Sequence, residues 1–247
     1  LMKNADTAMY TAKNQGRNNF QFFSQEMNVV ATRFFQMEQQ LRHALEHEEF
    51  VLHYQPQIDS SAQRVCGLEA LVRWQNPAGG LVPPAEFIGV AEETGLILEL
   101  GNWVMHEACR QLREWYDAGW PQVTMAVNLS PRQFQQKDLV ARVRQTIDEF
   151  GLLPQSLELE ITESSLMHSV EDALAQVQAL ADMGVRLAID DFGTGYSSLA
   201  YLKRFPVSRL KIDRSFVRDV CEDRDSAAIV ASIIGLAKSL SMEVVAE

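Results

Sequence analysis

Residues 185–195 read VRLAIDDFGTG, an apolar run that ends in two adjacent acids, Asp190 and Asp191, and in a glycine-rich turn. Glycine lets the backbone leave the extended conformation, so the pattern predicts a strand with both acids at its C-terminal edge. Adjacent like charges repel and raise each other's pKa unless a cation lies between them. The pair therefore indicates a bridge between metal ions rather than a purely structural feature.

Outward from this strand, extended apolar runs alternate with helical patterns. The predicted strands are 51–57, 65–72, 123–128, 157–162, 186–190, 208–212 and 243–246, and helical patterns at 102–118, 137–149, 169–183 and 223–240 separate most of them. This alternation indicates a mainly parallel α/β sheet. Seven strands without a doubly wound nucleotide-binding fingerprint favour a TIM-like (β/α) barrel that lacks its last strand. An open barrel exposes unpaired edges, so we expect the chain to continue beyond Glu247.

Two segments precede the predicted barrel. Residues 1–24 carry a short helical pattern, a break at Gly16 and a strand-like run at 19–23, which is too little to form a core and indicates the end of a preceding domain. From residue 25 to about 48, apolar side chains at helical spacing lie beside a face rich in Gln and Glu. We assign residues 25–40 to a connector helix that is a candidate for self-association, and residues 41–247 to the barrel domain.

The composition indicates a soluble globular protein with a large core, since 47% of the 247 residues are hydrophobic. No apolar run approaches the roughly 20 residues that span a bilayer, and the N-terminus is not a signal peptide. The three widely spaced cysteines, Cys66, Cys109 and Cys221, offer no disulfide framework and favour a reducing cytoplasm. A net charge of -11 argues against binding to nucleic-acid polymers or anionic membranes.

Polar residues end successive predicted strands. They are Glu69, Asn128, Glu160, Asp190 with Asp191, Lys211 with Asp213, and Glu247. All strand ends of a (β/α) barrel meet at its C-terminal mouth, so we expect one site there. Oxygen ligands without Cys or His suit Mg²⁺, Mn²⁺ or Ca²⁺. Two such ions about 3.5–4 Å apart, bridged by Asp190, would suit attack on a phosphodiester, with Glu247 and Lys211 orienting or deprotonating the water.

Several of these residues have simpler interpretations when taken alone. A single acid at a strand end is more often salt-bridged or solvated than catalytic, and Asn128 could be a turn residue or a helix cap. Arg73 could be a surface base that packs on Trp74. His43 and His47 stand four residues apart and could share a metal, but the glutamates around them favour a solvated helix face.

Six motifs resemble, in order, those of EAL-domain cyclic di-GMP phosphodiesterases, over roughly residues 40–247. They are Glu69-Ala70-Leu71, Asn128-Leu129-Ser130, Glu158-Leu159-Glu160-Ile161-Thr162-Glu163, Asp190-Asp191-Phe192-Gly193-Thr194-Gly195, Leu210-Lys211-Ile212-Asp213 and Val245-Ala246-Glu247. Residues 4–18 resemble the C-terminal end of a GGDEF (diguanylate cyclase) domain, whose catalytic motif is absent from this sequence.

The resemblance implies a role for each matching residue. It implies a first metal on Glu69, Asn128, Glu160 and Asp190, and a second on Asp190, Asp191 and Asp213. It implies Glu247 as general base and Lys211 as a contact to the water or the scissile phosphate. It also implies that Glu163 anchors the loop after Asp191, and that Gln55 and Arg73 contact substrate.

The resemblance further implies hydrolysis of cyclic di-GMP to linear 5′-pGpG with two Mg²⁺ or Mn²⁺ ions, Ca²⁺ being a candidate inhibitor. Implied partners are a second copy of the EAL domain and, in the full-length protein, an upstream GGDEF domain and sensory domains that could anchor it to a membrane. The alternative is a non-catalytic cyclic di-GMP receptor. Retention of every matched metal-binding acid favours the enzyme, although a chain without its last strand could itself be inactive.

Overall fold

The computed structural model describes residues 9, 20, 22–168, 170–194 and 199–247. The chain divides into two compact units, each described by itself: Leu1–Phe50 with Trp74–Leu96, and Val51–Arg73 with Ile97–Glu247. Most of residues 1–24, where we predicted the end of a preceding domain, lie outside the described residues. Residues 20 and 22–24 are neither helix nor strand, so the strand predicted at 19–23 is wrong at those positions.

The first unit is built around an aromatic core and two helices, α2 (Gln25–Glu46) and α3 (Pro84–Thr94). The rings of Phe50, Trp74 and Phe87 lie 5.7 to 6.1 Å apart and are buried. The Trp74 indole N–H donates to Glu49 Oε2 at 2.9 Å, which satisfies the polar group of this core. Here the end of strand β2 (Arg64–Asn76) pairs antiparallel with the short strand β3 (Gly80–Val82). The predicted connector at 25–40 is helical, and α2 continues past it to Glu46.

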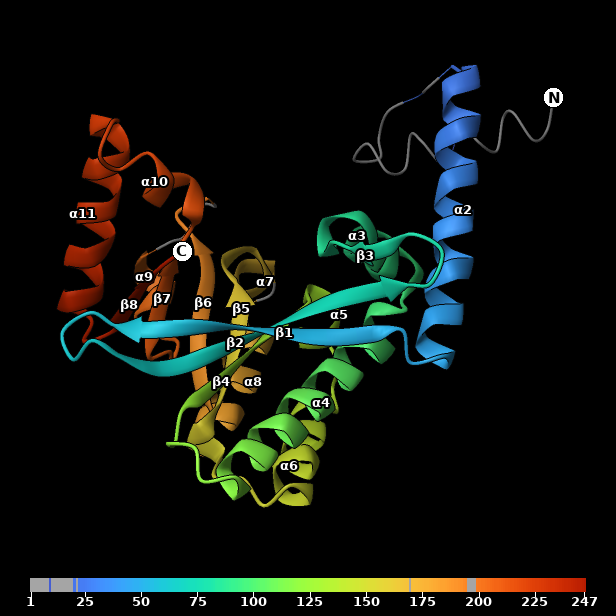
Figure 1. Ribbon diagram of the computed structural model, residues 1–247. Coiled ribbons are helices and arrows are strands. Elements are labelled where there is room, and N and C mark those ends of the chain that lie inside the picture. The colour runs from blue at the N-terminus through green and yellow to red at the C-terminus, as the bar shows by residue number, and fades with distance from the viewer. Residues whose placement is uncertain (1–8, 10–19, 21, 169, 195–198) are drawn as a thin grey trace. The chain divides into compact units, whose positions relative to one another are not determined.

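The second unit contains a curled sheet of mostly parallel strands (Figure 1). In hydrogen-bonded order the strands are β1 (Phe50–Asp59), β2 (Arg64–Asn76), β4 (Thr124–Leu129), β5 (Leu157–Thr162), β6 (Arg186–Phe192), β7 (Arg209–Ile212) and β8 (Glu243–Ala246). A tight turn joins β1 to β2, which runs in the opposite direction, and each neighbouring pair from β2 to β8 is parallel. The predicted mainly parallel α/β sheet is confirmed.

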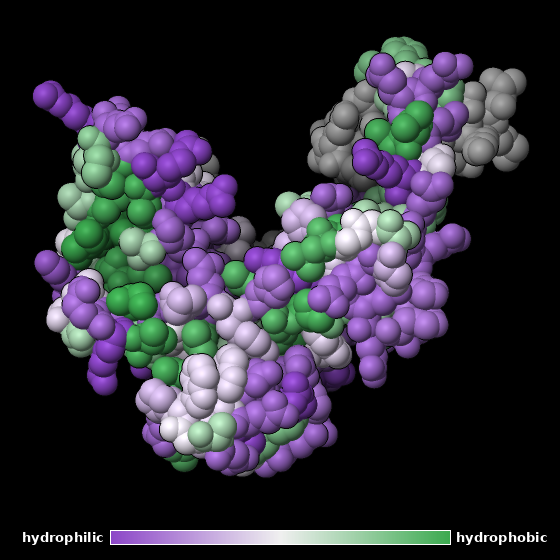
Figure 2. Space-filling view, in the orientation of Figure 1, coloured by the Kyte–Doolittle hydropathy of each residue, from purple (hydrophilic) through white to green (hydrophobic). Residues whose placement is uncertain are grey.

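Helices lie between the parallel strands along the chain. The long ones are α4 (Ile97–Asp117), α6 (Leu139–Glu149), α8 (Val170–Asp182) and α11 (Arg224–Ser239), and the short ones are α5 (Pro131–Phe134), η1 (Pro154–Ser156), α7 (Glu163–His168), α9 (Leu199–Leu202) and α10 (Arg214–Arg218). Apolar surface lies over α11, where Ile229 is 38% exposed (Figure 2). None of the helices in the described part of the chain has the length and apolar composition needed to cross a membrane.

The long helices begin and end within five residues of the predicted positions. Helix α3, strand β3 and the short helices were not predicted; β3 and the short helices contain too few residues for a repeating pattern. Strand β2 continues further than predicted at its C-terminal end. We predicted a strand at 65–72 with Glu69 at its end, but β2 continues to Asn76, so Glu69 lies inside the strand, one residue before its pairing with β4 ends at Ala70.

Candidate active site

The candidate site is built on the alternation of side chains along β5 and β7. Leu157, Leu159 and Ile161 of β5 are fully buried apolar residues, and the acids between them point to the opposite face of the strand. The acid Glu160 meets Lys211 of β7, with Lys211 Nζ 2.6 Å from Glu160 Oε2. Lys211 is one of the largest fully buried side chains in the described chain. A buried ammonium therefore occupies the interior of the sheet.

Lys211 is surrounded by carboxylates from four other strands or strand ends. Its Nζ lies 2.6 Å from Glu247 Oε1, 3.2 Å from Glu69 Oε2 and 3.2 Å from Asp190 Oδ1, in addition to the Glu160 contact. Asn128 joins the group through Nδ2, which donates to Glu69 Oε1 at 2.8 Å. With Asp191 and Asp213 these residues form the mouth cluster, which consists of Glu69, Asn128, Glu160, Asp190, Asp191, Lys211, Asp213 and Glu247.

The charges of the mouth cluster perturb one another. Burial alone would lower the pKa of Lys211, but the carboxylates of Glu160, Asp190 and Glu69 outweigh it and raise that pKa. Burial raises the pKa of Glu160 well above its usual value, and the charges of Glu69 and Asp190 add to the rise despite Lys211. Burial also raises the pKa of Glu247. Lys211 is therefore held as a cation among acids that are expensive to ionise together.

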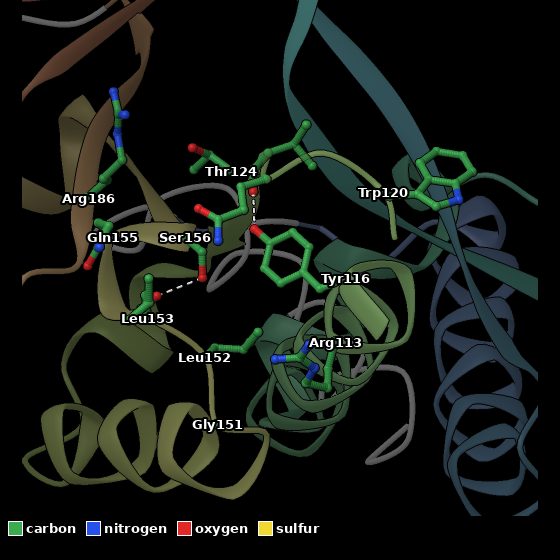
Figure 3. A pocket seen from close by; sticks show the side chains of 12 residues that line it. Arg113, Tyr116, Trp120, Thr124, Gly151, Leu152, Leu153, Gln155, Ser156 and Arg186 are labelled. Atoms are coloured by element: carbon green, nitrogen blue, oxygen red, sulfur yellow. Dashed lines mark hydrogen bonds between the residues drawn. The ribbon is translucent and has the colours of Figure 1, made fainter. Parts of the chain in front are cut away.

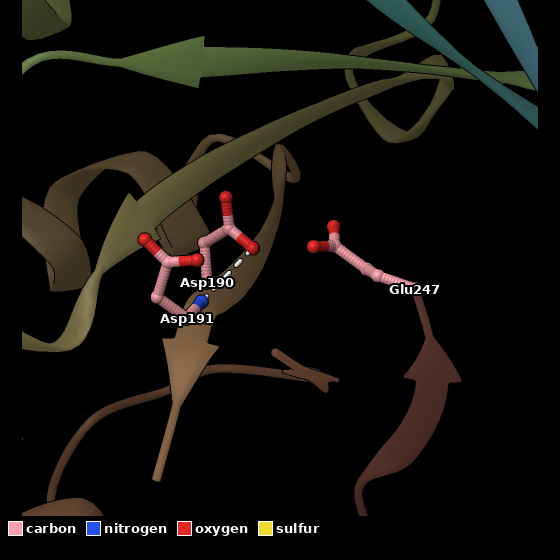
Figure 4. Close-up of side chains that lie close together, drawn as sticks. All are labelled: Asp190, Asp191 and Glu247. Carbon is pink, nitrogen blue, oxygen red and sulfur yellow. Dashed lines mark hydrogen bonds between the residues drawn. The ribbon is translucent and has the colours of Figure 1, made fainter. Parts of the chain in front are cut away.

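A bulge at the end of β6 brings both adjacent aspartates to the mouth cluster. Neighbouring residues of a regular strand point to opposite faces. The pairing of β6 with β7 shifts register between Ile189 and Phe192, and Asp191 has φ 53°, a left-handed conformation that aspartate tolerates better than most residues. Asp190, Asp191 and Glu247 each have a carboxylate oxygen within 4.8 Å of a carboxylate oxygen of the other two. Glu247 points toward Asp190 from the end of β8 (Figure 4).

The loop after β6 and the start of α10 are fixed by two further acids. Glu163, at the start of α7, accepts a hydrogen bond from the Gly193 backbone N–H at 3.0 Å, which supports its predicted role as the anchor of this loop. Gly193 has φ 101°, so a side chain there would be strained. Asp213 caps α10 by accepting from the Ser215 backbone N–H at 2.9 Å. Burial and the charges of Asp190 and Asp213 raise the pKa of Asp191.

A pocket of about 1000 Å³ opens beside the mouth cluster. Gln55 lines it together with Glu69 and Glu247, so one of the two residues predicted to contact substrate faces this space. Arg73 is not among the lining residues, and its Nη1 donates to its neighbour's carbonyl, Val72 O, at 2.8 Å. Sequence reasoning did not find Arg214, an exposed cation that also lines the pocket directly after Asp213.

The residues of the mouth cluster fit divalent cations. The mouth cluster contains one ammonium, Lys211, and an excess of carboxylates, which leaves it with a large negative charge. The carboxylates are those of Glu69, Glu160, Asp190, Asp191, Asp213 and Glu247. Glu160 Oε1 is buried and lacks a hydrogen-bond partner. A buried carboxylate oxygen without a partner is costly unless a cation contacts it. Oxygen donors of this kind are the ligands that Mg²⁺ and Mn²⁺ prefer.

Comparison with known proteins assigns the family. The EAL domain profile matches residues 38–247. The chain belongs to the EAL domain family. A solved structure described as the PaMucR phosphodiesterase in complex with c-di-GMP superimposes with a TM-score of 0.83 at 47% identity, over 85% of each chain. EAL structures are TIM-like barrels, so the predicted fold class is confirmed, with the strands forming a curled half-barrel.

Curated relatives carry this EAL domain as part of longer proteins. The chain is 49% identical over 247 residues to the bifunctional diguanylate cyclase/cyclic di-GMP phosphodiesterase MucR of Pseudomonas aeruginosa, covering all of this chain and 36% of that protein. It is 42% identical over 247 residues to the cyclic di-GMP phosphodiesterase PdeR of Escherichia coli, covering all of this chain and 37% of that protein. The chain therefore spans about a third of the length of these relatives.

Proposed function

We propose that this EAL domain is a phosphodiesterase that opens cyclic di-GMP to linear 5′-pGpG. The observation that carries the proposal is the mouth cluster, in which one buried lysine is surrounded by acids from β2, β5, β6 and β8. The relatives named as cyclic di-GMP phosphodiesterases and the similar structure in complex with c-di-GMP support this choice of substrate.

Water attack on one phosphodiester would form a new P–O bond and break the bond to the sugar oxygen. Glu247 would take the proton of that water, since its carboxylate lines the pocket and burial raises its pKa. Lys211 Nζ lies 2.6 Å from Glu247 Oε1 and 2.6 Å from Glu160 Oε2. Its positive charge would stabilise the negative charge of the phosphate.

Two divalent cations, Mg²⁺ or Mn²⁺, would supply the positive charge that activates the water and neutralises the attacking and leaving oxygens. Glu69, Asn128, Glu160 and Asp190 would hold one ion, and Asp190, Asp191 and Asp213 the other. Gln55 would contact the substrate from β1. Arg73 would have to release Val72 O to reach a phosphate.

The wider organisation of the protein is proposed from the same family membership. We infer that the full-length protein carries a GGDEF domain upstream, works as a homodimer through the EAL domain and is inhibited when Ca²⁺ replaces the smaller ions. The upstream regions would receive the signal and set any attachment to a membrane.

Incubation of the full-length protein with cyclic di-GMP tests the proposal. Chromatography is expected to show linear pGpG with Mg²⁺ or Mn²⁺ and intact substrate after chelation by EDTA. Absence of pGpG with both metals, while circular dichroism shows a folded protein, would reject the phosphodiesterase. Binding of cyclic di-GMP without turnover would then indicate a receptor.

A further inference from the structure

A second set of charges lies on the same strands as the mouth cluster, with Glu158 and Arg209 buried and the side chains of Arg186 and Glu243 30% and 60% exposed. Arg209 Nη1 donates to Glu158 Oε1 at 2.6 Å, and Arg209 Nη2 donates to Glu243 Oε2 at 2.6 Å. Arg186 Nη2 donates to Glu243 Oε2 at 2.9 Å. The Glu158 side chain is 0% exposed and that of Arg209 is 8% exposed. Glu158, Arg186, Arg209 and Glu243 are called the ionic layer below.

The ionic layer is in strict register with the mouth cluster. Glu158 and Arg209 stand two residues before Glu160 and Lys211, so each pair projects from the same face of its strand. Across the strands, Glu158 is paired in register with Arg186, and Arg209 with Glu243. The layer therefore joins β5, β6, β7 and β8, the four strands that also provide Glu160, Asp190, Lys211 and Glu247.

The first strand of the sheet is tied to the same layer. Arg209 Nη1 also donates to Gln57 Oε1 at 3.1 Å. A Cβ atom at Gly67 would lie 2.8 Å from that oxygen, so a larger residue there would displace the end of the Gln57 side chain. Arg186, Arg209 and Glu243 also line the pocket of about 1000 Å³, and Arg186 lines a second pocket of about 440 Å³ at the N-terminal ends of β4, β5 and β6 (Figure 3).

Stability alone does not explain the buried Glu158–Arg209 pair. Barrel interiors are usually filled by branched apolar side chains, and replacing a buried ion pair by apolar residues of similar volume is often neutral or stabilising. Charges add direction that apolar contacts lack, because an arginine that bonds to two carboxylates fixes their relative positions. A displacement of about 1 Å in a catalytic group can cost about 100-fold in rate.

We propose that the ionic layer is a positioning device for the mouth cluster. By fixing β5, β7 and β8 against one another, it sets the spacing of Glu160, Lys211 and Glu247, and with it the affinity for divalent cations. This inference rests on the proposed function for its effect on turnover, while its effect on metal affinity can be measured separately.

The test replaces Glu158 and Arg209 together by methionine in the full-length protein. The remaining Arg186–Glu243 ion pair then has no net charge. We expect the melting temperature to stay within a few degrees of the wild type, because the volumes are similar and no charge is left alone. Mn²⁺ affinity, measured by electron paramagnetic resonance, is expected to fall about tenfold or more, and turnover of cyclic di-GMP about 100-fold. Mn²⁺ affinity and turnover within twofold of the wild type would overturn the proposal.

A second variant and a control keep the result interpretable. If the double variant does not fold, Glu158→Gln is measured in its place, because glutamine keeps the shape of the side chain. Unchanged Mn²⁺ affinity in Glu158→Gln would also overturn the proposal. The control replaces the exposed pair Asp138 and Arg142 by Asn and Met, and should leave both measurements unchanged. Mn²⁺ binding by a wild type that makes no pGpG would reject the proposed function and leave the ionic layer to be judged by affinity. A wild type that binds no Mn²⁺ would overturn both.

Discussion

Replacement of Lys211 by methionine tests whether the lysine charge stabilises the carboxylates of the mouth cluster. Methionine keeps most of the volume of the lysine stem and removes the charge, while the acids around it remain. Of the four carboxylates in contact with Lys211, those of Glu69, Asp190 and Glu247 are 13% to 28% exposed and water can solvate them. Glu160 is 0% exposed, so its charge would be left buried without a partner.

The expected loss of stability comes from the buried carboxylate of Glu160. Removing one member of a buried ion pair costs about 3–5 kcal/mol, and we expect the lower end, about 3 kcal/mol, because Glu160 can take up a proton. For a chain of this size this corresponds to a fall of about 6–12 °C in melting temperature. The pKa of Glu160 in the folded protein is already raised, and loss of Lys211 raises it further. The folded variant therefore binds a proton more readily than the unfolded chain, and its stability increases as pH falls. The loss of stability relative to the wild type is expected to be larger at pH 8 than at pH 5.

Thermal unfolding in EDTA and in Mn²⁺ measures both parts of this prediction. Mn²⁺ at 100 times its dissociation constant should raise the free energy of unfolding of the variant by about 2.7 kcal/mol. A bound divalent cation can replace the positive charge that the variant lacks. The matched control is Arg142→Met, which removes one member of an exposed ion pair and should change stability by about 0.5 kcal/mol or less. A melting temperature within 2 °C of the wild type for Lys211→Met in EDTA would refute the reasoning, because the expected shift is about 6–12 °C.

Three further predictions concern single residues. Glu247→Gln should lower kcat by about 100-fold or more with little change in KM, because a general base acts in the transition state; an equal loss of substrate binding, measured by calorimetry, would instead make Glu247 a structural ligand. Gly101→Ala should destabilise the protein by about 1–3 kcal/mol in urea unfolding, because its Cβ would lie 2.1 Å from the buried Gln133 side chain; unchanged stability would mean that this contact relaxes freely. Burial raises the pKa of the Cys109 thiol to about 12, so a thiol reagent at pH 8 should modify the exposed Cys221 and leave Cys109 intact until the protein unfolds; fast labelling of Cys109 would contradict its burial.

The sequence was sufficient to predict the sheet and the residues that meet at its C-terminal edge. The strands carry long apolar patterns, and the polar residues that interrupt them recur at matching positions, so Glu160 and Lys211 could be placed together before the structure was known. The structure brings them to 2.6 Å. Of the two predicted substrate contacts, Gln55 lines the pocket and Arg73 does not.

Other features depend on backbone geometry that no periodicity reports. Regular alternation would send Asp190 and Asp191 to opposite faces of β6, and only the bulge with a left-handed Asp191 brings both to one cluster. The ionic layer was missed for a different reason. Glu158 and Arg209 stand at the same period-two positions as Glu160 and Lys211, but charged residues inside a strand are usually interpreted as solvent-facing.

Anomalous diffraction from crystals soaked in Mn²⁺ can show whether the mouth cluster is a two-metal centre. We expect two peaks, one contacted by Glu69, Asn128, Glu160 and Asp190, and one contacted by Asp190, Asp191 and Asp213. The peaks should lie about 3.5–4 Å apart. No peak at the mouth cluster, or ordered Mn²⁺ only at other surface carboxylates, would contradict the account.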